Sequence, residues 1–259
     1  MNPRLLLQVK GTTMAGPTQP RRRGWYGIDA PYAPAFMTAM TVIVFVMAII
    51  SGHWQTFVPV TFMLAVLGFY LHSTLRGKFV VWANLLDQLH LRGDERILDM
   101  GCGRGAVLLM AAQHLTTGRA VGVDLWRSAD QSGNSAEATR RNAIAEGVAD
   151  RVELHTGDMT ALPFEDNSFD LIVSSLAIHN ISGSAGREKA IDEAVRVLRP
   201  GGRLLIADIR GTRQHQAQLA KIGMSDVTRR RLGWQFWWGG PWAATRLVTA
   251  SKPKAATQE

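Results

Sequence analysis

The sequence predicts an α/β fold, built on a mostly parallel seven-stranded sheet and preceded by a two-helix hydrophobic hairpin. Three observations predict it: two uncharged apolar runs come first, strands and helices alternate after residue 77, and a glycine-rich turn follows the first strand. Such alternation places helices on both faces of a parallel sheet. The expected order is a basic flexible tail over 1–33, the hairpin over 34–72 and the α/β domain over 73–259.

Composition narrows the possible partners. The chain of 259 residues carries a net charge of +8, and its first 34 residues hold five basic side chains against Asp29. A basic stretch beside a hydrophobic segment favours an anionic membrane over nucleic acid. The single cysteine, Cys102, excludes an intrachain disulfide and leaves no thiolate cluster for a metal.

The hairpin prediction rests on charge as well as apolar length. No Asp, Glu, Lys or Arg lies between Asp29 and Arg76, and the apolar runs Pro34–Ser51 and Phe57–Leu71 approach the length of about 20 residues that spans a bilayer. Arginines 21–23 precede the first run, so the positive-inside rule places both ends on the cytoplasmic side. The alternatives are a helical pair packed on the domain and an interfacial re-entrant pair. A cleaved signal peptide is disfavoured because the apolar run starts late.

The spacing of apolar residues predicts the helices and strands of the α/β domain. Helices are expected over 79–89, 106–115, 135–146 and 188–198, and strands over 96–100, 120–124, 152–155, 171–175 and 203–208. A closing antiparallel hairpin is expected over 232–238 and 243–250, joined by Gly239-Gly240-Pro241. One antiparallel edge is common on such sheets.

The segment 97–105, Ile-Leu-Asp-Met-Gly-Cys-Gly-Arg-Gly, is the central functional signal. Its glycines allow a sharp turn between strand and helix, and the helix N-terminus offers free N–H groups to a nucleotide-like ligand. The glycine spacing also satisfies a dinucleotide fingerprint, so it does not choose the ligand. Asp99 discriminates between the possible ligands, because a carboxylate before the turn repels a pyrophosphate but can pair with an amino group.

Two further segments follow in register. Asp124 ends the second strand, 25 residues beyond Asp99, where a carboxylate can accept hydrogen bonds from ribose hydroxyls or cap a helix. Thr156-Gly157-Asp158-Met159 follows the third strand, and 196–203 turns a helix into the fifth strand through Pro200-Gly201-Gly202.

Together these segments resemble the motifs of class I S-adenosylmethionine-dependent methyltransferases over residues 96–209. The resemblance implies a Rossmann-like fold and S-adenosylmethionine as cofactor. It also implies that Asp124 binds ribose, that Leu125 or Trp126 lies against adenine, and that Asp158 meets the adenine amino group with Met159 beside the ring. The expected cofactor-binding residues are Asp99, Gly101, Cys102, Gly103, Gly105, Asp124, Leu125, Trp126, Gly157, Asp158, Met159 and Ser174.

The methyl acceptor is less defined. By family position the segment 174–180 faces the transferred methyl group, which makes His179 the candidate base, because a histidine titrates near neutrality. The alternative is a structural histidine bonded to nearby backbone. The chain has no Asn-Pro-Pro-Tyr-like segment, which disfavours planar-nitrogen acceptors, and its single cysteine disfavours arsenite.

Three arginines, 229–231, precede a cluster of aromatic residues near the C-terminus: Trp234, Phe236, Trp237, Trp238 and Trp242. This pattern fits an interfacial contact with anionic lipid, a nucleic-acid patch, or a strand hairpin packed on the sheet.

The sequence therefore predicts a membrane-anchored S-adenosylmethionine-dependent methyltransferase that acts on a lipid or hydrophobic small molecule. Anchoring raises the effective concentration of enzyme where such an acceptor partitions. The alternatives are a methyltransferase of a soluble small molecule or protein, and a cofactor-binding membrane adaptor without catalysis. A nicotinamide-dependent oxidoreductase is disfavoured by Asp99 and by the later motifs.

Overall fold

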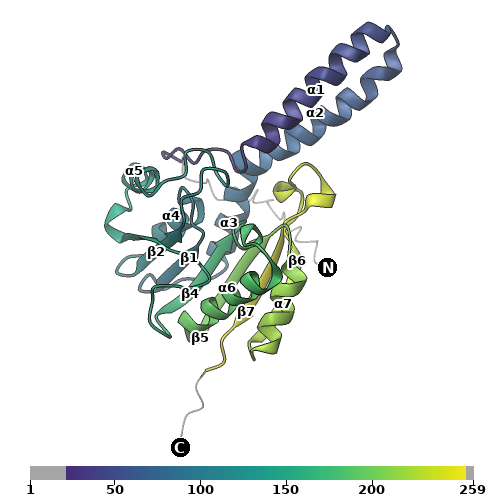
Figure 1. Ribbon diagram of the computed structural model, residues 1–259. Helices are drawn as coiled ribbons and strands as arrows, with labels where there is room; N and C mark the ends of the chain where they lie inside the picture. The colour runs from purple at the N-terminus through teal and green to yellow at the C-terminus, as the bar shows by residue number, and fades with distance from the viewer. Residues whose placement is uncertain (1–21, 255–259) are drawn as a thin grey trace, which may run out of the picture.

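The computed structural model describes residues 22–254, and its centre is a seven-stranded sheet of order β3-β2-β1-β4-β5-β7-β6 (Figure 1). β1 to β5 are parallel, and β7 runs antiparallel to both of its neighbours. The expected fold class is confirmed. The strands are β1 Arg96–Met100, β2 Arg119–Asp124, β3 Val152–Thr156, β4 Phe169–Ser175, β5 Leu198–Asp208, β6 Ser225–Arg231 and β7 Arg246–Ser251.

Helices cover both faces of the sheet. On one face lie α3 Lys78–Asp87, α4 Ala106–Gln113 and α5 Ala136–Glu146, and on the other lie α6 Ser184–Val197 and α7 Thr212–Lys221 (Figure 1). Short 3-10 turns occupy Ala149–Arg151, Ile178–Asn180, Trp234–Phe236 and Pro241–Ala243. Each face has its own apolar core, with Trp82 and Leu108 fully buried in the first and Ile191 and Leu219 in the second.

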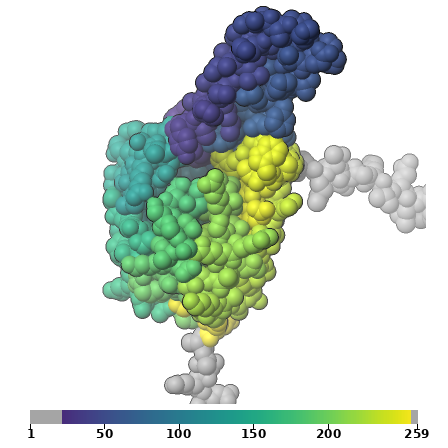
Figure 2. Space-filling model, turned by 45° about the vertical axis from the view of Figure 1, so that its right-hand side comes forward, coloured from purple at the N-terminus to yellow at the C-terminus, as the bar shows by residue number. Residues whose placement is uncertain are grey.

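The two apolar runs form a helical hairpin that projects away from the domain (Figures 1 and 2). α1 Tyr32–Ser51 ends at Gly52, and after the 3-10 turn Trp54–Thr56 the chain returns as α2 Phe57–His72. In the most apolar 18-residue stretch of each helix, only 17% is buried in α1 and 22% in the continuous helix Trp54–Asp87. Both helices are long and apolar enough to cross a membrane.

α2 continues into the domain without a break. A single π-helical turn, Ser73–Gly77, joins it to α3, so one helical rod connects the projecting hairpin with the sheet. A Cβ atom on Gly77 would lie 1.7 Å from the carbonyl oxygen of Gln235, which means that only glycine permits this close approach of the two backbones.

Residues 22–31 differ from the flexible tail that the sequence predicts. They form an extended strap on the domain: Ser132 donates from its N–H to Ile28 O, and Ala30 N–H donates to Asp130 O. The Tyr26 ring is buried, and its hydroxyl donates to Glu146. The remainder of the predicted tail, residues 1–21, lies outside the described residues.

The C-terminal strand hairpin begins earlier in the sequence than predicted. Its strands are β6 and β7 at 225–231 and 246–251, and the intervening aromatic segment forms 3-10 turns instead of a strand. Trp234, Phe236 and Trp238 therefore do not share one strand face: Trp234 is 52% exposed, whereas Phe236 and Trp238 are buried. The glycine and proline residues break the extended backbone here. α7 was not predicted.

Candidate active site

The glycine-rich turn lies at the carboxyl end of β1, where it leads into α4. Gly101 has φ +76°, and a Cβ atom on it would lie 2.2 Å from the Cβ of Ala177, just past β4. Glycine is therefore required both by the backbone conformation and by the approach of the next loop. Gly103 and Gly105 also have positive φ, and Gly105 precedes the first residue of α4.

Asp99 is buried in β1 directly beneath this turn. Its side chain is 1% exposed, and Oδ1 has no hydrogen-bond partner among the described residues. Burial raises the pKa of this carboxyl group to about 8, and the nearby charge of Asp124 adds to the effect. An unpartnered buried carboxylate calls for a cation, so the site fits the ammonium group of an amino acid moiety better than a phosphate.

Asp124 ends β2 as expected, and its carboxylate organises the turn. Oδ2 accepts from Gly103 N–H at 2.8 Å, while Oδ1 accepts from Trp126 N–H at 2.6 Å and from the Asn134 amide at 3.2 Å. The carboxylate thus joins the β1 turn to the loop after β2, at the carboxyl edge where a ribose would lie.

The residues expected around adenine gather at the ends of β2 and β3. Leu125 is 43% exposed, and the Trp126 indole donates to Thr156 Oγ1 at 2.8 Å, which holds the ring between the two strands. Gly157 N–H donates to Asp124 O, and Asp158 is exposed with its carboxylate accepting from Thr160 N–H.

The Met159 sulfur lies 3.6 Å from a Cβ atom built on Gly101, so this residue also lies beside the turn. Two of the predicted residues point elsewhere. Cys102 packs its buried side chain into the core, and the Ser174 hydroxyl donates to Met100 O, tying β4 to β1. Neither side chain faces outward from the carboxyl edge, so only their backbone atoms remain available to a cofactor.

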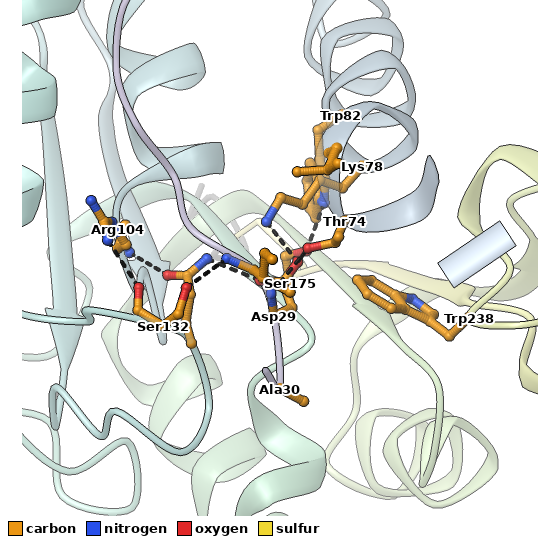
Figure 3. Close-up of polar contacts among 12 residues, drawn as sticks. Asp29, Ala30, Thr74, Lys78, Trp82, Arg104, Ser132, Ser175 and Trp238 are labelled. Carbon is orange, nitrogen blue, oxygen red and sulfur yellow. Dashed lines mark hydrogen bonds and ion pairs between the residues drawn. The ribbon is translucent and has the colours of Figure 1, made fainter. Parts of the chain in front are cut away.

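The strap closes over this edge through Asp29, a contact that the sequence did not suggest (Figure 3). Asp29 Oδ2 accepts from Thr74 Oγ1 and pairs with the Lys78 ammonium, both at 2.7 Å, while Oδ1 accepts from the Gln131 amide at 2.9 Å. Gln131 Oε1 in turn accepts from Arg104 N–H at 2.8 Å. A continuous polar chain therefore links the base of the hairpin to the glycine-rich turn.

His179 lies in the 3-10 turn after β4, and the structure gives it a partner. Its Nδ1 is 2.6 Å from Oδ1 of Asp208, a fully buried carboxylate at the end of β5, and Asp208 Oδ2 accepts from the backbone N–H of His179. Ile209 N–H donates to the same carboxylate, which fixes its orientation. The contact of Nδ1 lacks hydrogen-bond geometry among the described residues, so the backbone bond and the charge of Asp208 position the ring. Nε2 is the ring nitrogen outside this contact.

Sequence reasoning did not single out Asp208, although it ends a predicted strand beside the strand that leads to His179. His215 was also missed: it is buried near Asp208, and neither ring nitrogen has a hydrogen-bond partner among the described residues. Burial lowers its pKa, which favours the neutral ring. Trp82 in α3 donates from its indole to Ser175 Oγ at 2.9 Å, at the end of β4. These long-range contacts have no local signature in the sequence.

Comparison with known proteins agrees with this geometry. Residues 98–206 match a family model described as a methyltransferase domain. The matched segment runs from β1 to β5 and includes the glycine-rich turn, Asp124 and His179. The expected enzyme class, an S-adenosylmethionine-dependent methyltransferase, is confirmed for this domain.

Three curated relatives resemble the methyltransferase domain in sequence. The chain is 36% identical over 124 residues to a ubiquinone/menaquinone biosynthesis C-methyltransferase UbiE of Roseobacter denitrificans, covering 48% of the chain and 46% of the relative. It is 36% identical to the methyltransferase GfsG of Streptomyces halstedii (57% and 50% covered), and 34% identical to a demethylmenaquinone methyltransferase of Symbiobacterium thermophilum (50% and 49%). The chain spans about half the length of these relatives.

Solved structures share the fold of the methyltransferase domain. The [4+2]-cyclase SpnF superposes with a TM-score of 0.54 at 22% identity, covering 67% of this chain and 82% of that one. Geranyl diphosphate methyltransferase in complex with SAM gives 0.54 at 18% identity, covering 67% and 85%. At these identities the likeness establishes the fold alone.

Proposed function

We propose that this protein is a membrane-attached S-adenosylmethionine-dependent methyltransferase whose acceptor is an apolar molecule held at the bilayer surface. One observation carries the proposal: a single helical rod runs from the exposed apolar hairpin to the carboxyl end of β4, where Trp82 donates to Ser175, four residues before His179. The hairpin and the edge that would receive the acceptor are therefore on the same side of the molecule (Figure 1).

The exposed hairpin surface supports attachment to a membrane. Large apolar side chains lie on its outer faces with 44–73% of their surface exposed: Phe36, Val42, Ile43, Phe45, Val46, Met47, Ile49, Ile50, Val58, Phe62 and Leu64. A contiguous apolar surface of this extent is costly in water, whereas lipid removes that cost. Exposed Arg76 and Arg22 lie at the hairpin base, where their positive charge favours the approach to an anionic surface.

The residues at the carboxyl edge support the assignment of the cofactor. Asp99 would face the ammonium group, Asp124 the ribose, and Trp126 with Met159 the adenine ring. When bound, S-adenosylmethionine supplies an electrophilic methyl group, so much of the protein's contribution lies in alignment. His179, oriented by Asp208, would accept the proton that the acceptor loses, through Nε2.

The names of the relatives suggest a chemical class of acceptor. One of those described above is named a ubiquinone/menaquinone biosynthesis C-methyltransferase, and another is named a demethylmenaquinone methyltransferase. A prenylated hydroquinone meets both requirements of this site: its tail partitions into the bilayer, and removal of a ring hydroxyl proton by His179 would make the neighbouring ring carbon nucleophilic. We therefore propose a hydroxylated, lipid-soluble aromatic acceptor.

Label transfer tests the proposal. The full-length protein, held in nanodiscs, is given methyl-labelled S-adenosylmethionine with demethylmenaquinol carrying a long or a truncated prenyl tail, or with a cell extract split into lipid and aqueous phases. Asp99→Ala serves as the control. The proposal predicts label in the lipid phase, loss of label in Asp99→Ala, and faster transfer to the long-tailed quinol.

Label confined to the aqueous or protein fraction would overturn the apolar acceptor and favour the soluble-substrate alternative. Cofactor binding without transfer to any fraction would favour a membrane adaptor that lacks catalysis.

A further inference from the structure

The segment between β6 and β7 is a second apolar element beside the hairpin. No charged residue lies between Arg231 and Arg246, and the segment 232–245, here called the aromatic loop, holds four of the protein's eight tryptophans. Its backbone consists of two 3-10 turns joined through Gly239 and Gly240.

The aromatic loop packs along α2, and successive loop residues contact positions progressively closer to the hairpin tip. Three aromatic pairs join the loop to α2. The distances between ring centroids are 5.0 Å for Trp234 stacked on His72, 5.8 Å for Trp237 and Phe69, and 6.1 Å for Trp242 and Phe62. Figure 2 shows this segment, in yellow, against the lower part of the hairpin. Since α-helices rise about 1.5 Å per residue, the contacts extend about 15 Å up the helix from His72 to Phe62.

The base of the aromatic loop is locked to the hairpin. Ser73 in the π-helical turn donates from its hydroxyl to Trp237 O at 2.7 Å, and Gly77 leaves room for the carbonyl group of Gln235. Any membrane that takes up the hairpin must therefore meet the aromatic loop as well.

The outer surface of the loop remains uncovered. Trp242 is 65% exposed and Trp234 is 52% exposed, while exposed Arg231 precedes the loop directly. Tryptophan prefers the membrane–water interface, and arginine beside it pairs with anionic headgroups. Irregular backbone is not tolerated in the hydrocarbon core when it faces lipid, so the interface is the depth that suits this loop.

We infer that the aromatic loop is a second membrane contact, seated in the interfacial layer of the leaflet that the hairpin enters, and that it holds the hairpin within that leaflet. This inference rests on the proposed membrane attachment. With Trp242 at the interface, the part of α2 beyond Phe62 is about 9 Å long up to Thr56. One leaflet offers about 15 Å of hydrocarbon, so this part enters it without crossing the bilayer.

This proposal differs from the spanning topology that the sequence predicts. A hairpin that spanned upright, with its tip at the far interface, would carry Trp242 and irregular backbone well past the midplane. The polar tip is suited to the shallower position because several of its groups bond to each other: Ser51 Oγ donates to Ala48 O, and Thr56 Oγ1 donates to His53 O.

Site-directed fluorescence tests depth directly. Single cysteines replace Trp242, Ile50 near the hairpin tip, or Ile144 on α5, an exposed apolar control (68% exposed) on the domain. Each is labelled with an environment-sensitive dye, and the wild type, with only buried Cys102, measures background labelling. The proteins are reconstituted in vesicles of phosphatidylcholine with a minority of phosphatidylglycerol that carry nitroxide quenchers at the headgroup or along the acyl chain.

The expected pattern is distinct at each position. The Trp242 probe is quenched most strongly from the headgroup, the Ile50 probe from the acyl chain, and the Ile144 probe only by aqueous iodide. A Trp242 probe as open to iodide as the Ile144 probe, with Ile50 still in lipid, overturns the aromatic loop contact and leaves the anchor standing. An Ile50 probe in water overturns the membrane attachment itself.

Accessibility of the tip settles the topology. The proposal predicts that a cysteine at Trp54 is not labelled by a membrane-impermeant thiol reagent from the side opposite the domain in sealed vesicles. Labelling from that side overturns the single-leaflet placement. Flotation adds a second measure: Trp234→Ala/Trp242→Ala should lower binding to vesicles with phosphatidylglycerol at least several-fold, whereas Ile144→Ala should not.

Discussion

Replacing Asp29 by alanine removes the anionic partner of a buried ammonium group. Asp29 Oδ2 lies 2.7 Å from Lys78 Nζ, and the two side chains are 19% and 5% exposed. Breaking a buried ion pair by removing one partner costs about 3–5 kcal/mol, because the remaining charge stays desolvated. Since water reaches part of Asp29, we expect the lower end of this range, about 3 kcal/mol in the free energy of unfolding.

Thermal unfolding of the detergent-held protein measures this loss. In a chain of this size each kcal/mol shifts the midpoint by about 2–4 °C, so Asp29→Ala should lower it by about 6–12 °C. Lys78→Met, added to Asp29→Ala, removes the stranded charge and should recover at least about 1 kcal/mol.

Cofactor affinity supplies a readout that simple destabilisation does not predict. Asp29 holds the Gln131 amide, and Gln131 holds the backbone N–H of Arg104 at the glycine-rich turn. Loss of one such bond is worth about 1 kcal/mol, so the Kd for S-adenosylmethionine should rise about five- to tenfold in Asp29→Ala. Lys78→Met should not restore it, because Gln131 remains without its partner.

Asp94→Ala is the matched control. Asp94 pairs with Arg92 at 2.9 Å on the surface, where both side chains are largely exposed, and exposed pairs contribute little. Equal shifts of the unfolding midpoint in Asp29→Ala and Asp94→Ala would contradict the stabilising role of the buried pair, and an unchanged cofactor affinity in Asp29→Ala would contradict its link to the glycine-rich turn.

Three further perturbations address the site itself. Asp208→Asn keeps the shape of the carboxyl group but removes the charge facing His179 Nδ1, so turnover should fall by about a hundredfold or more with cofactor affinity retained. Affinity for S-adenosylmethionine should rise about tenfold per pH unit well below pH 8, because only ionised Asp99 pairs with an ammonium group, and Asp99→Asn should abolish this dependence. Gly101→Ala should lower the free energy of unfolding by more than about 2 kcal/mol, since its Cβ would overlap Ala177.

Each of these has a control and an opposing outcome. Asp87→Asn alters a surface aspartate 3.6 Å from His114, and turnover should not change. If Asp208→Asn also leaves turnover unchanged, His179 has a structural role. Gly147→Ala, with φ +73° and open space around its Cβ, should cost only the backbone strain of about 1 kcal/mol. If Gly101→Ala lowers the free energy of unfolding by no more than Gly147→Ala does, the contact between Gly101 and Ala177 is not tight.

Stability supplies a second test of Asp99. Its pKa in the folded protein is raised above the ordinary carboxyl value, so the unfolded chain releases this proton first as pH rises. The cofactor-free protein should therefore lose stability between about pH 4 and pH 8, and Asp99→Asn should lose less over the same interval. An identical pH dependence of unfolding in both proteins would contradict the burial argument.

The sequence alone determined the elements that depend on local pattern. Strands β1 to β4 lie within two residues of their predicted positions, because each carries apolar residues bounded by polar or glycine residues. β5 begins at Leu198, five residues before its predicted start. The glycine-rich turn and Asp124 were found for the same reason: their spacing along one strand–turn–helix unit fixes where they lie. The two uncharged runs likewise sufficed to predict a helical hairpin.

Only the tertiary structure decided which distant residues meet. The pairing of His179 with Asp208, the bond from Trp82 to Ser175 and the path from Lys78 through Asp29 to Gln131 each join segments far apart in the chain. The strap and the aromatic loop were misassigned because both lack periodicity; they are ordered by what they touch. Pattern along a chain specifies which face of an element is buried, but a contact between elements depends on how the whole sheet and the hairpin pack, and no local signal carries that information.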